Sequence, residues 1–340
     1  MRVVVVMPQG PREAYAAIED AGHELVLGDA ESSRGPRPSD DLIIPVADGA
    51  HCLVYNEGSR RLMEALPELT ACIATGLGYD KIDVAAANEL GIVVCHTPTP
   101  LQSIGVAEGT FTLMLAVAKR LTQKSAGLHA GRWANDADEG TLIHGSTVGL
   151  VGLGHIGTSF TRMLNGWNAR LLVHTRTPKP DVFAEVKAEP VDLQTLLRES
   201  DFVVLTVPLT EETYGMIGRD ELRSMKPTAA VINTSRGQVI DEAALSEAIN
   251  EGWIAGAGID VYSREPLPMD SPLLALDPDR VLLTAHNVSS AEASRIWGAP
   301  AGIVAKTGTG TGAGSVAETR RSERALLARI RTPFSARTSR

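Results

Sequence analysis

A glycine-rich turn constrains the fold of this chain more than any other feature of its sequence. Glycines stand at positions 152, 154 and 157, in GxGxxG spacing, between the apolar run Val148–Val151 and the helical segment Thr158–Leu164. This spacing allows a tight turn, close approach of the backbone to a pyrophosphate, and close packing of the helix on the strand. The free N–H groups at the helix start attract phosphate. The pattern predicts a dinucleotide site at Gly152, Gly154, His155, Ile156 and Gly157, with a merely structural glycine turn as the alternative.

Apolar β-type runs alternate with helical segments along most of the chain. One series of runs occupies Val3–Met7, His51–Tyr55, Ala71–Ala74 and Ile92–Cys95. A second series contains the glycine turn and continues at Arg170–His174, Phe202–Val207, Ala230–Asn233, Ala255–Asp260 and Val281–Thr284. Such alternation with short connections is typical of a parallel sheet covered by helices. We therefore predict an α/β protein with two doubly wound parallel-sheet domains.

The stretch between the two series predicts a domain boundary. Thr97-Pro-Thr-Pro100 is a stiff connector, and the apolar segment Val106–Leu121 after it predicts a long helix. Earlier in the chain, the Pro- and Asp-rich segment Pro36–Pro45 predicts a loop. A length of 340 residues fits two domains of roughly 100–200 residues each.

Composition narrows the classes of function. A net charge of −9 argues against a nucleic-acid-binding surface, which needs clustered Lys and Arg. No purely apolar run approaches the ~20 residues of a membrane helix, so no membrane span is expected. Cys52, Cys72 and Cys95 lie far apart without CxxC pairing, which predicts neither a metal site nor a disulfide framework and fits a cytoplasmic location.

The end of the strand after the glycine turn predicts the cofactor's identity. An Asp or Glu at this place would hold the ribose hydroxyls of NAD, but the chain has Thr175, Arg176 and Thr177 there. A guanidinium with hydroxyl neighbours suits a 2′-phosphate. The sequence therefore favours NADP(H) over NAD(H), with Arg176 as an ordinary solvated loop residue as the alternative.

Three further segments carry reactive side chains at the ends of predicted strands, the edge where open α/β sheets bind ligands. They are Asn233-Thr-Ser-Arg-Gly237, Asp260-Val-Tyr-Ser-Arg-Glu-Pro266 and Thr284-Ala-His-Asn287. Taken singly, Arg236 could be a turn residue, Glu265 a solvated acid and His286 a strand-end histidine bonded to backbone. Their joint occurrence beside a nucleotide turn makes all three catalytic candidates.

Together with Ala74-Thr-Gly-Leu-Gly-Tyr-Asp80 and Val106-Ala-Glu108, these motifs resemble the D-isomer-specific 2-hydroxyacid dehydrogenases, the family that includes glyoxylate/hydroxypyruvate reductases. The resemblance covers residues 3–296. It implies a Rossmann cofactor domain (99–287, with a dimerisation helix) inserted in a flavodoxin-like substrate domain (1–98 and 288–305). It also implies a homodimer that reduces a small 2-oxo acid to the D-2-hydroxy acid.

The resemblance also implies a role for each residue. Arg236 would bind the substrate carboxylate and carbonyl oxygen, His286 would donate a proton to that oxygen, and Glu265 would fix the imidazole and favour its protonated form. Backbone N–H groups of Leu77 and Gly78 would bind the carboxylate. The matching cofactor residues are Val207, Pro208 and Thr234, with Asp260 at the nicotinamide carboxamide.

The chain departs from the family pattern at three places. Relatives usually present glycines after His286, where this chain has Asn287-Val-Ser-Ser290, and commonly a His where Gly109 stands. Residues 306–340 are rich in Gly, Thr and Arg and predict a flexible or divergent tail. These departures leave two alternatives open, a non-catalytic NAD(H)-sensing scaffold of the same fold and a catalytically impaired relative.

Overall fold

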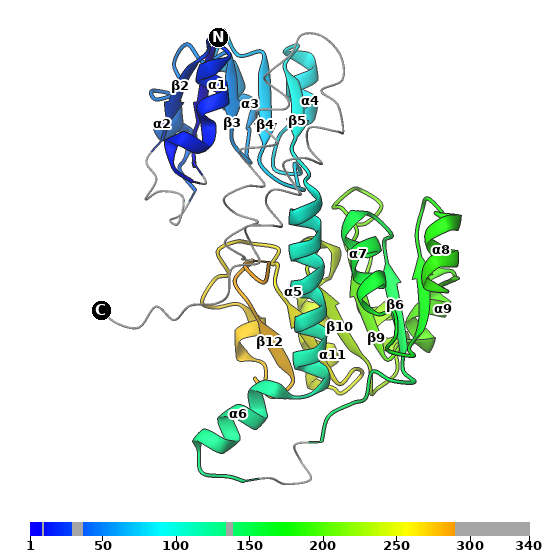
Figure 1. The fold of residues 1–340 in the computed structure, drawn as a ribbon. Helices are drawn as coiled ribbons and strands as arrows, with labels where there is room; N and C mark the ends of the chain where they lie inside the picture. Colours follow the sequence, from blue (N-terminus) through cyan, green and yellow to red (C-terminus); the bar gives the residue numbers. More distant parts are fainter. Residues whose placement is uncertain (9, 29–36, 134–138, 290–340) are drawn as a thin grey trace.

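A computed structural model describes residues 1–8, 10–28, 37–133 and 139–289 of the chain. Figure 1 shows two lobes, with β1–β5 and α1–α4 in one and the elements from β6 onward in the other. The long helix α5 (Pro100–Ala118) runs from the first lobe along the second. Each lobe is built on a single parallel sheet.

The first lobe has a five-stranded sheet in the order β2-β1-β3-β4-β5, with all neighbouring strands parallel. Its strands are β1 (Arg2–Val5), β2 (Glu24–Leu27), β3 (Cys52–Val54), β4 (Ala71–Ala74) and β5 (Val93–His96). This is the flavodoxin-like strand order, as predicted. Strand β2 was not predicted from the sequence, because this short edge strand buries only one of its side chains fully.

The second lobe has a seven-stranded parallel sheet in the order β12-β11-β10-β9-β6-β7-β8. Its strands are β6 (Thr147–Val151), β7 (Arg170–His174), β8 (Glu189–Pro190), β9 (Phe202–Leu205), β10 (Ala230–Asn233), β11 (Gly256–Ile259) and β12 (Val281–Leu283). From β8 to β11 this is the Rossmann order, which confirms the predicted cofactor fold. The order reverses between β6 and β9, where ligands bind in such sheets.

The inner strands of both sheets are buried on both faces, which explains why they are continuous apolar runs. In β1, Val3 and Val5 join one hydrophobic cluster and Val4 joins the cluster on the opposite face. In β9, Val203 and Val204 divide in the same way. Successive side chains of a strand point to opposite faces, so only a sheet covered by helices on both sides buries every one.

The covering helices are short apart from α5. The first lobe has the 3-10 helix η1 (Arg12–Tyr15), α1 (Ala16–Asp20), α2 (Asp40–Ile43), α3 (Arg60–Glu64) and α4 (Val84–Glu89). The second has α6 (Leu121–His129), α7 (His155–Met163), α8 (Pro180–Val186), α9 (Leu193–Glu199), α10 (Arg219–Ser224), η4 (Gly237–Val239), α11 (Glu242–Asn250) and η5 (Pro272–Ala275). The prediction of a loop at Pro36–Pro45 is wrong at residues 40–43, where α2 forms with two acids in its first turn.

Helix α5 begins six residues before the predicted Val106, at Pro100. Pro100 occupies the first turn, where its missing N–H costs no hydrogen bond. Thr99 and Gln102 form a capping box, in which each side chain accepts a hydrogen bond from the other's backbone N–H. The helix thus begins at the last residue of the predicted connector, and residues 97–99 remain outside it.

By length and composition alone, α5 could cross a membrane. Leu113 and Met114 are fully buried, however, and the helix packs against α7 and the strands β10 and β11. We interpret α5 as a core helix of the second lobe.

Two predicted segments lie mostly or wholly outside the described residues. Of the return to the substrate domain at 288–305, only Val288 and Ser289 are described, and the predicted tail at 306–340 is not described at all. The domain boundaries at 98/99 and 287/288 therefore stay predictions, although each lobe has its own sheet.

Candidate active site

The glycine turn connects β6 to α7 at the carboxyl edge of the seven-stranded sheet. Gly152 has a φ of 98°, and a Cβ on it would lie 2.8 Å from Cγ1 of Val207. A Cβ on Gly157 would lie 2.3 Å from the Gly152 carbonyl oxygen. Both glycines are therefore needed for the turn to close and for α7 to pack on the sheet.

Gly154 differs from these two glycines because open space surrounds it. No atom lies within 4 Å of a Cβ built on Gly154, which is the N-cap of α7 and precedes His155. The first N–H groups of a helix have no partner within the helix and attract phosphate. The residues present therefore fit the pyrophosphate of a dinucleotide cofactor.

The predicted recognition residues Thr175, Arg176 and Thr177 follow β7 at the same edge, and the last two are exposed. The pKa of Glu212 is lowered by a hydrogen bond from Thr210, and the charge of Arg176 lowers it further. Arg176 therefore lies near the loop that follows β9, on the same side of the sheet as the glycine turn.

The other predicted cofactor residues follow β9 and β10. Val207 is partly buried against Gly152, and Pro208 is exposed beside it. Thr234 is buried, and its hydroxyl lies 2.7 Å from that of Thr110 on α5. The Thr234 hydroxyl thus already has a partner within the protein.

Arg236 stands in a turn after β10 that Asn233 stabilises. Oδ1 of Asn233 accepts hydrogen bonds from the N–H (3.0 Å) and hydroxyl (2.7 Å) of Ser235, and Nδ2 donates to the Arg236 carbonyl at 2.9 Å. A Cβ on Gly237 would lie 1.9 Å from the Tyr262 carbonyl carbon. Glycine at 237 therefore lets the turn carrying Arg236 pack directly on the loop that leads to Glu265.

The Arg236 guanidinium reaches across to the first lobe. Its Nε donates to Oδ1 of Asp80 at 2.8 Å, and its Nη2 lies 2.8 Å from the same oxygen. A Cβ on Gly78 would lie 1.5 Å from Nη2, so the guanidinium rests against the Gly78 backbone. The structure thus brings together Arg236 and the loop with Leu77 and Gly78, both partly buried after β4.

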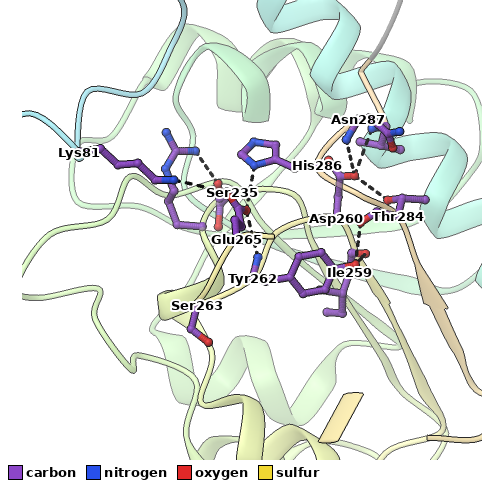
Figure 2. Close-up of polar contacts among 12 residues, drawn as sticks. Lys81, Ser235, Ile259, Asp260, Tyr262, Ser263, Glu265, Thr284, His286 and Asn287 are labelled. Atoms are coloured by element: carbon purple, nitrogen blue, oxygen red, sulfur yellow. Dashed lines mark hydrogen bonds and ion pairs between the residues drawn. The ribbon is translucent and has the colours of Figure 1, made fainter. Parts of the chain in front are cut away.

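Glu265 and His286 form the proposed acid pair. Nδ1 of His286 lies 2.9 Å from Oε1 of Glu265, which also accepts a hydrogen bond from the Tyr262 N–H at 3.3 Å (Figure 2). Burial alone would raise the pKa of Glu265. The hydrogen bond and charge of His286, the Tyr262 N–H and the charge of Lys81 outweigh burial and lower that pKa to about 2. Glu265 is therefore ionised at neutral pH.

Asp260 has a role that the sequence did not indicate. Its Oδ1 accepts hydrogen bonds from the Thr284 hydroxyl (2.6 Å) and the N–H groups of Asn287 (2.9 Å) and Val288 (3.1 Å). These bonds enclose His286, whose φ of 52° is unusual for a residue with a side chain. Asp260, buried under the loop, therefore holds His286 in its orientation (Figure 2).

Two departures from the family pattern meet in space. Gly109 is buried in α5, and a Cβ on it would lie 2.5 Å from the Val288 carbonyl oxygen and 2.8 Å from Val288 Cγ1. The small residue on α5 therefore makes room for a larger residue in the loop after His286.

Asp80 ends the motif Ala74–Asp80, but the sequence pattern indicates no role for Asp80 or Lys81. Lys81 Nζ lies 3.6 Å from Oε2 of Glu265. The sequence does hold one signal for them: Asp80 and Lys81 carry opposite charges and follow Gly78-Tyr79 in the loop after a predicted strand. Among the described residues, no cluster of three His, Cys, Asp or Glu side chains is arranged to hold a metal ion.

Comparison with known proteins decides the family. Residues 111–288 match the model of the D-isomer specific 2-hydroxyacid dehydrogenase NAD binding domain. The chain belongs to this family. It is similar to the glyoxylate reductase of Korarchaeum cryptofilum, with 42% identity over 86% of this chain and 88% of that one. The glyoxylate/hydroxypyruvate reductase B of Pectobacterium carotovorum is 42% identical over 63% of this chain and 68% of its own length.

Solved structures agree with the fold. The TT0316 protein of Thermus thermophilus has a TM-score of 0.77 and 32% identity, covering 89% of this chain and 94% of its own. Membership makes this chain an NAD(P)-dependent 2-hydroxyacid dehydrogenase, an oxidoreductase that interconverts 2-oxo and 2-hydroxy acids with a nicotinamide cofactor.

Proposed function

We propose that this member of the family reduces glyoxylate, or a similarly short 2-oxo acid such as hydroxypyruvate, to the D-2-hydroxy acid with NADPH. One observation carries the proposal. Asp80 and Lys81, consecutive in the chain, contact Arg236 and Glu265 respectively, and Glu265 contacts His286. The three proposed catalytic groups are thus gathered around one loop of the substrate lobe.

The arrangement suits carbonyl reduction. The nicotinamide, when bound, supplies a hydride to C2 of the 2-oxo acid. Arg236 binds the substrate carboxylate and the carbonyl oxygen through the N–H donors that Asp80 and Ser235 leave free. Nε2 of His286 donates its proton to that oxygen, and ionised Glu265 stabilises the imidazolium and fixes which nitrogen faces the substrate. The products are a hydroxyl at C2 and a neutral imidazole.

The names of the relatives support glyoxylate and hydroxypyruvate as first substrates to test. We expect purified protein to oxidise NADPH with glyoxylate and hydroxypyruvate at higher kcat/KM than with branched or aromatic 2-oxo acids. Preference for a bulky 2-oxo acid would contradict the substrate assignment. Tight NADH binding without turnover of any acid would instead support a cofactor-sensing scaffold.

The NADPH preference rests on Arg176 at the end of β7, where the sequence offers no acid for the ribose hydroxyls. We expect Arg176→Ala to raise KM for NADPH about tenfold or more while leaving KM for NADH within about twofold, since one charge-assisted phosphate contact is worth roughly 1.5–3 kcal/mol. Arg198→Ala on α9, also an exposed arginine, is the matched control. Equal effects on both cofactors would contradict the assignment.

A homodimer and a cytoplasmic location complete the proposal. Leu121 and Leu128 on α6 are 59% and 58% exposed, which suits a covered apolar face. We expect sedimentation to give twice the chain mass of 36.1 kDa, and Leu128→Glu to weaken association. The thiols of Cys52 and Cys72 are free and lie on adjacent strands, as expected for a protein of a reducing compartment. Fractionation of cells would test the cytoplasmic location.

A further inference from the structure

Lys81 belongs to the first lobe but contacts the acid pair of the second. Its Nζ lies 3.6 Å from Oε2 of Glu265, the oxygen that His286 does not use. Figure 2 shows its side chain extending toward Glu265 from a different part of the ribbon than the one carrying His286. The proposed function gives this lysine no part in the reaction.

The backbone at Lys81 is fixed on both sides. The Gly58 N–H donates to the Lys81 carbonyl at 3.1 Å, and the Asp83 N–H donates to the Gly58 carbonyl at 2.8 Å. These bonds form an isolated parallel bridge between Gly58 and Ile82. Because the main chain is held in this way, only the side chain of Lys81 must be ordered for its ammonium group to reach Glu265.

Two carboxylates compete for the Lys81 ammonium. Oε1 of Glu57 lies 3.7 Å from Nζ, but Arg37 already binds the same oxygen at 2.7 Å. Glu265 has no arginine partner among the described residues, and its side chain is 19% exposed, compared with 33% for Glu57. Water screens a charge pair less where the partner is more buried. The charge of Lys81 therefore acts mainly on Glu265.

We infer that Lys81 is a positioning residue for His286, the acid of the proposed reaction. From the substrate lobe it contacts the second oxygen of Glu265, and it thereby limits how strongly this carboxylate stabilises the protonated His286. The inference rests on the proposed function and deepens it. Lys81 itself does not touch the reacting atoms; it acts through Glu265.

The direction of the effect follows from charge. A cation beside Glu265 weakens the attraction between this carboxylate and an imidazolium, so His286 releases its proton more readily. The Lys81–Glu265 pair joins the two lobes, so it exists only when the lobes are in contact. The contact between the lobes therefore favours transfer of the proton from Nε2 to the substrate carbonyl oxygen.

Glu242 and Asp260, two other charged groups near the pair, have hydrogen-bond partners of their own. Glu242 accepts the Ser263 N–H at 2.6 Å, and Asp260 binds the loop that carries His286. Among the described residues, the charged or titratable groups near the pair include Arg37, Glu57, Asp80, Arg236, Glu242, Asp260 and Tyr262. Of these, Glu57 offers a variant with the opposite expected effect on His286. Without the Glu57 carboxylate, Glu265 is the remaining carboxylate partner of Lys81 among the described residues.

The test measures the pH at which His286 loses its proton, in the full chain, by NMR titration of the imidazole Cε1–H, assigned with His286→Asn. We expect Lys81→Gln to raise the midpoint by about 0.3–0.6 pH unit, the size expected for a partly exposed pair. Lys81→Arg should restore it, and Glu57→Gln should lower it. Lys226→Gln, which removes the Lys226–Asp201 pair at the opposite ends of the strands, is the matched control.

The same variants are then assayed for NADPH-dependent reduction of glyoxylate across pH. The upper pH limit of kcat/KM should rise in Lys81→Gln by the same amount as the NMR midpoint. No change, or a fall, in the NMR midpoint would overturn the role of Lys81. Absence of turnover in the unaltered protein would overturn the proposed function instead, and the NMR result would still decide on Lys81.

Discussion

The carboxyl edges of the two sheets are closed in different ways. At the seven-stranded sheet, Gly157 packs on the Gly152 backbone and Gly152 packs on Val207, all within one lobe. At the five-stranded sheet, Gly78 meets the guanidinium of Arg236, which comes from the other lobe. The cofactor edge can therefore form within its own lobe, while the substrate edge is complete only when both lobes are in contact. Substitutions at the cofactor edge should then affect cofactor binding, and substitutions at the substrate edge should affect catalysis.

The largest expected effect is at the shared side chain. We predict that Arg236→Ala lowers kcat/KM for glyoxylate about 10²–10³-fold, because a charged donor to the developing oxyanion is lost. The NADPH dissociation constant, measured by fluorescence titration, should change less than about twofold. A comparable loss of cofactor affinity would show that the two edges do not act separately.

Gly78→Ala tests the contact between the lobes without removing the guanidinium. The added Cβ would lie 1.5 Å from Nη2, so Arg236 must move. We expect kcat/KM to fall about 10–100-fold, as it does when reacting groups are misplaced by about an ångström. In an Arg236→Ala background the same change should cost little more, because the group that it displaces is absent. Additive losses would contradict the contact.

Within the cofactor edge, Gly157 and Gly154 should separate folding from binding. Gly157→Ala places a Cβ 2.3 Å from a backbone oxygen, so we expect it to destabilise the protein by about 1–3 kcal/mol, seen as a lower Tm. Gly154→Ala meets open space and should leave Tm almost unchanged while weakening NADPH binding. A normal cofactor affinity in Gly154→Ala would argue that the space does not hold the phosphates.

The smallest expected effect is a shift in pH dependence. Glu265, with its pKa lowered to about 2, carries its charge throughout the neutral range, so the upper pH limit of reduction reports loss of the His286 proton. We expect Glu265→Gln to move that limit down by roughly 0.5–1 unit, because a negative charge beside the imidazolium is removed. An unchanged limit in the pH–rate profile would contradict the pairing.

The sequence predicted the fold of both lobes because their strands are buried on both faces and appear as continuous apolar runs. It failed where burial is partial, as in β2, and where a proline in the first turn of a helix was interpreted as part of a connector, as at Pro100. Both are local effects that periodicity does not register. The start of α5 could have been read from Thr99 and Gln102, three residues apart.

The candidate site was predicted only as a set of side chains at strand ends. Position along the chain indicated Arg236, Glu265 and His286, since parallel strands present their carboxyl ends at one edge. It did not show what Asp80 and Lys81 contact, because their partners lie in the other lobe. Nor could it show that Gly109 and Val288 compensate each other, since that contact depends on how α5 lies against the loop.

The central claim is that one guanidinium and one histidine–carboxylate pair act together on a carbonyl beside the cofactor. Its most direct test is the rate of NADPH oxidation after rapid mixing with glyoxylate, in the unaltered protein and in His286→Asn. Asparagine tolerates the φ of 52° at this position, so the loop should keep its shape. The account predicts rapid oxidation that falls about 10²–10⁴-fold in the variant, with NADPH affinity unchanged. A rate within tenfold of the unaltered protein would contradict it.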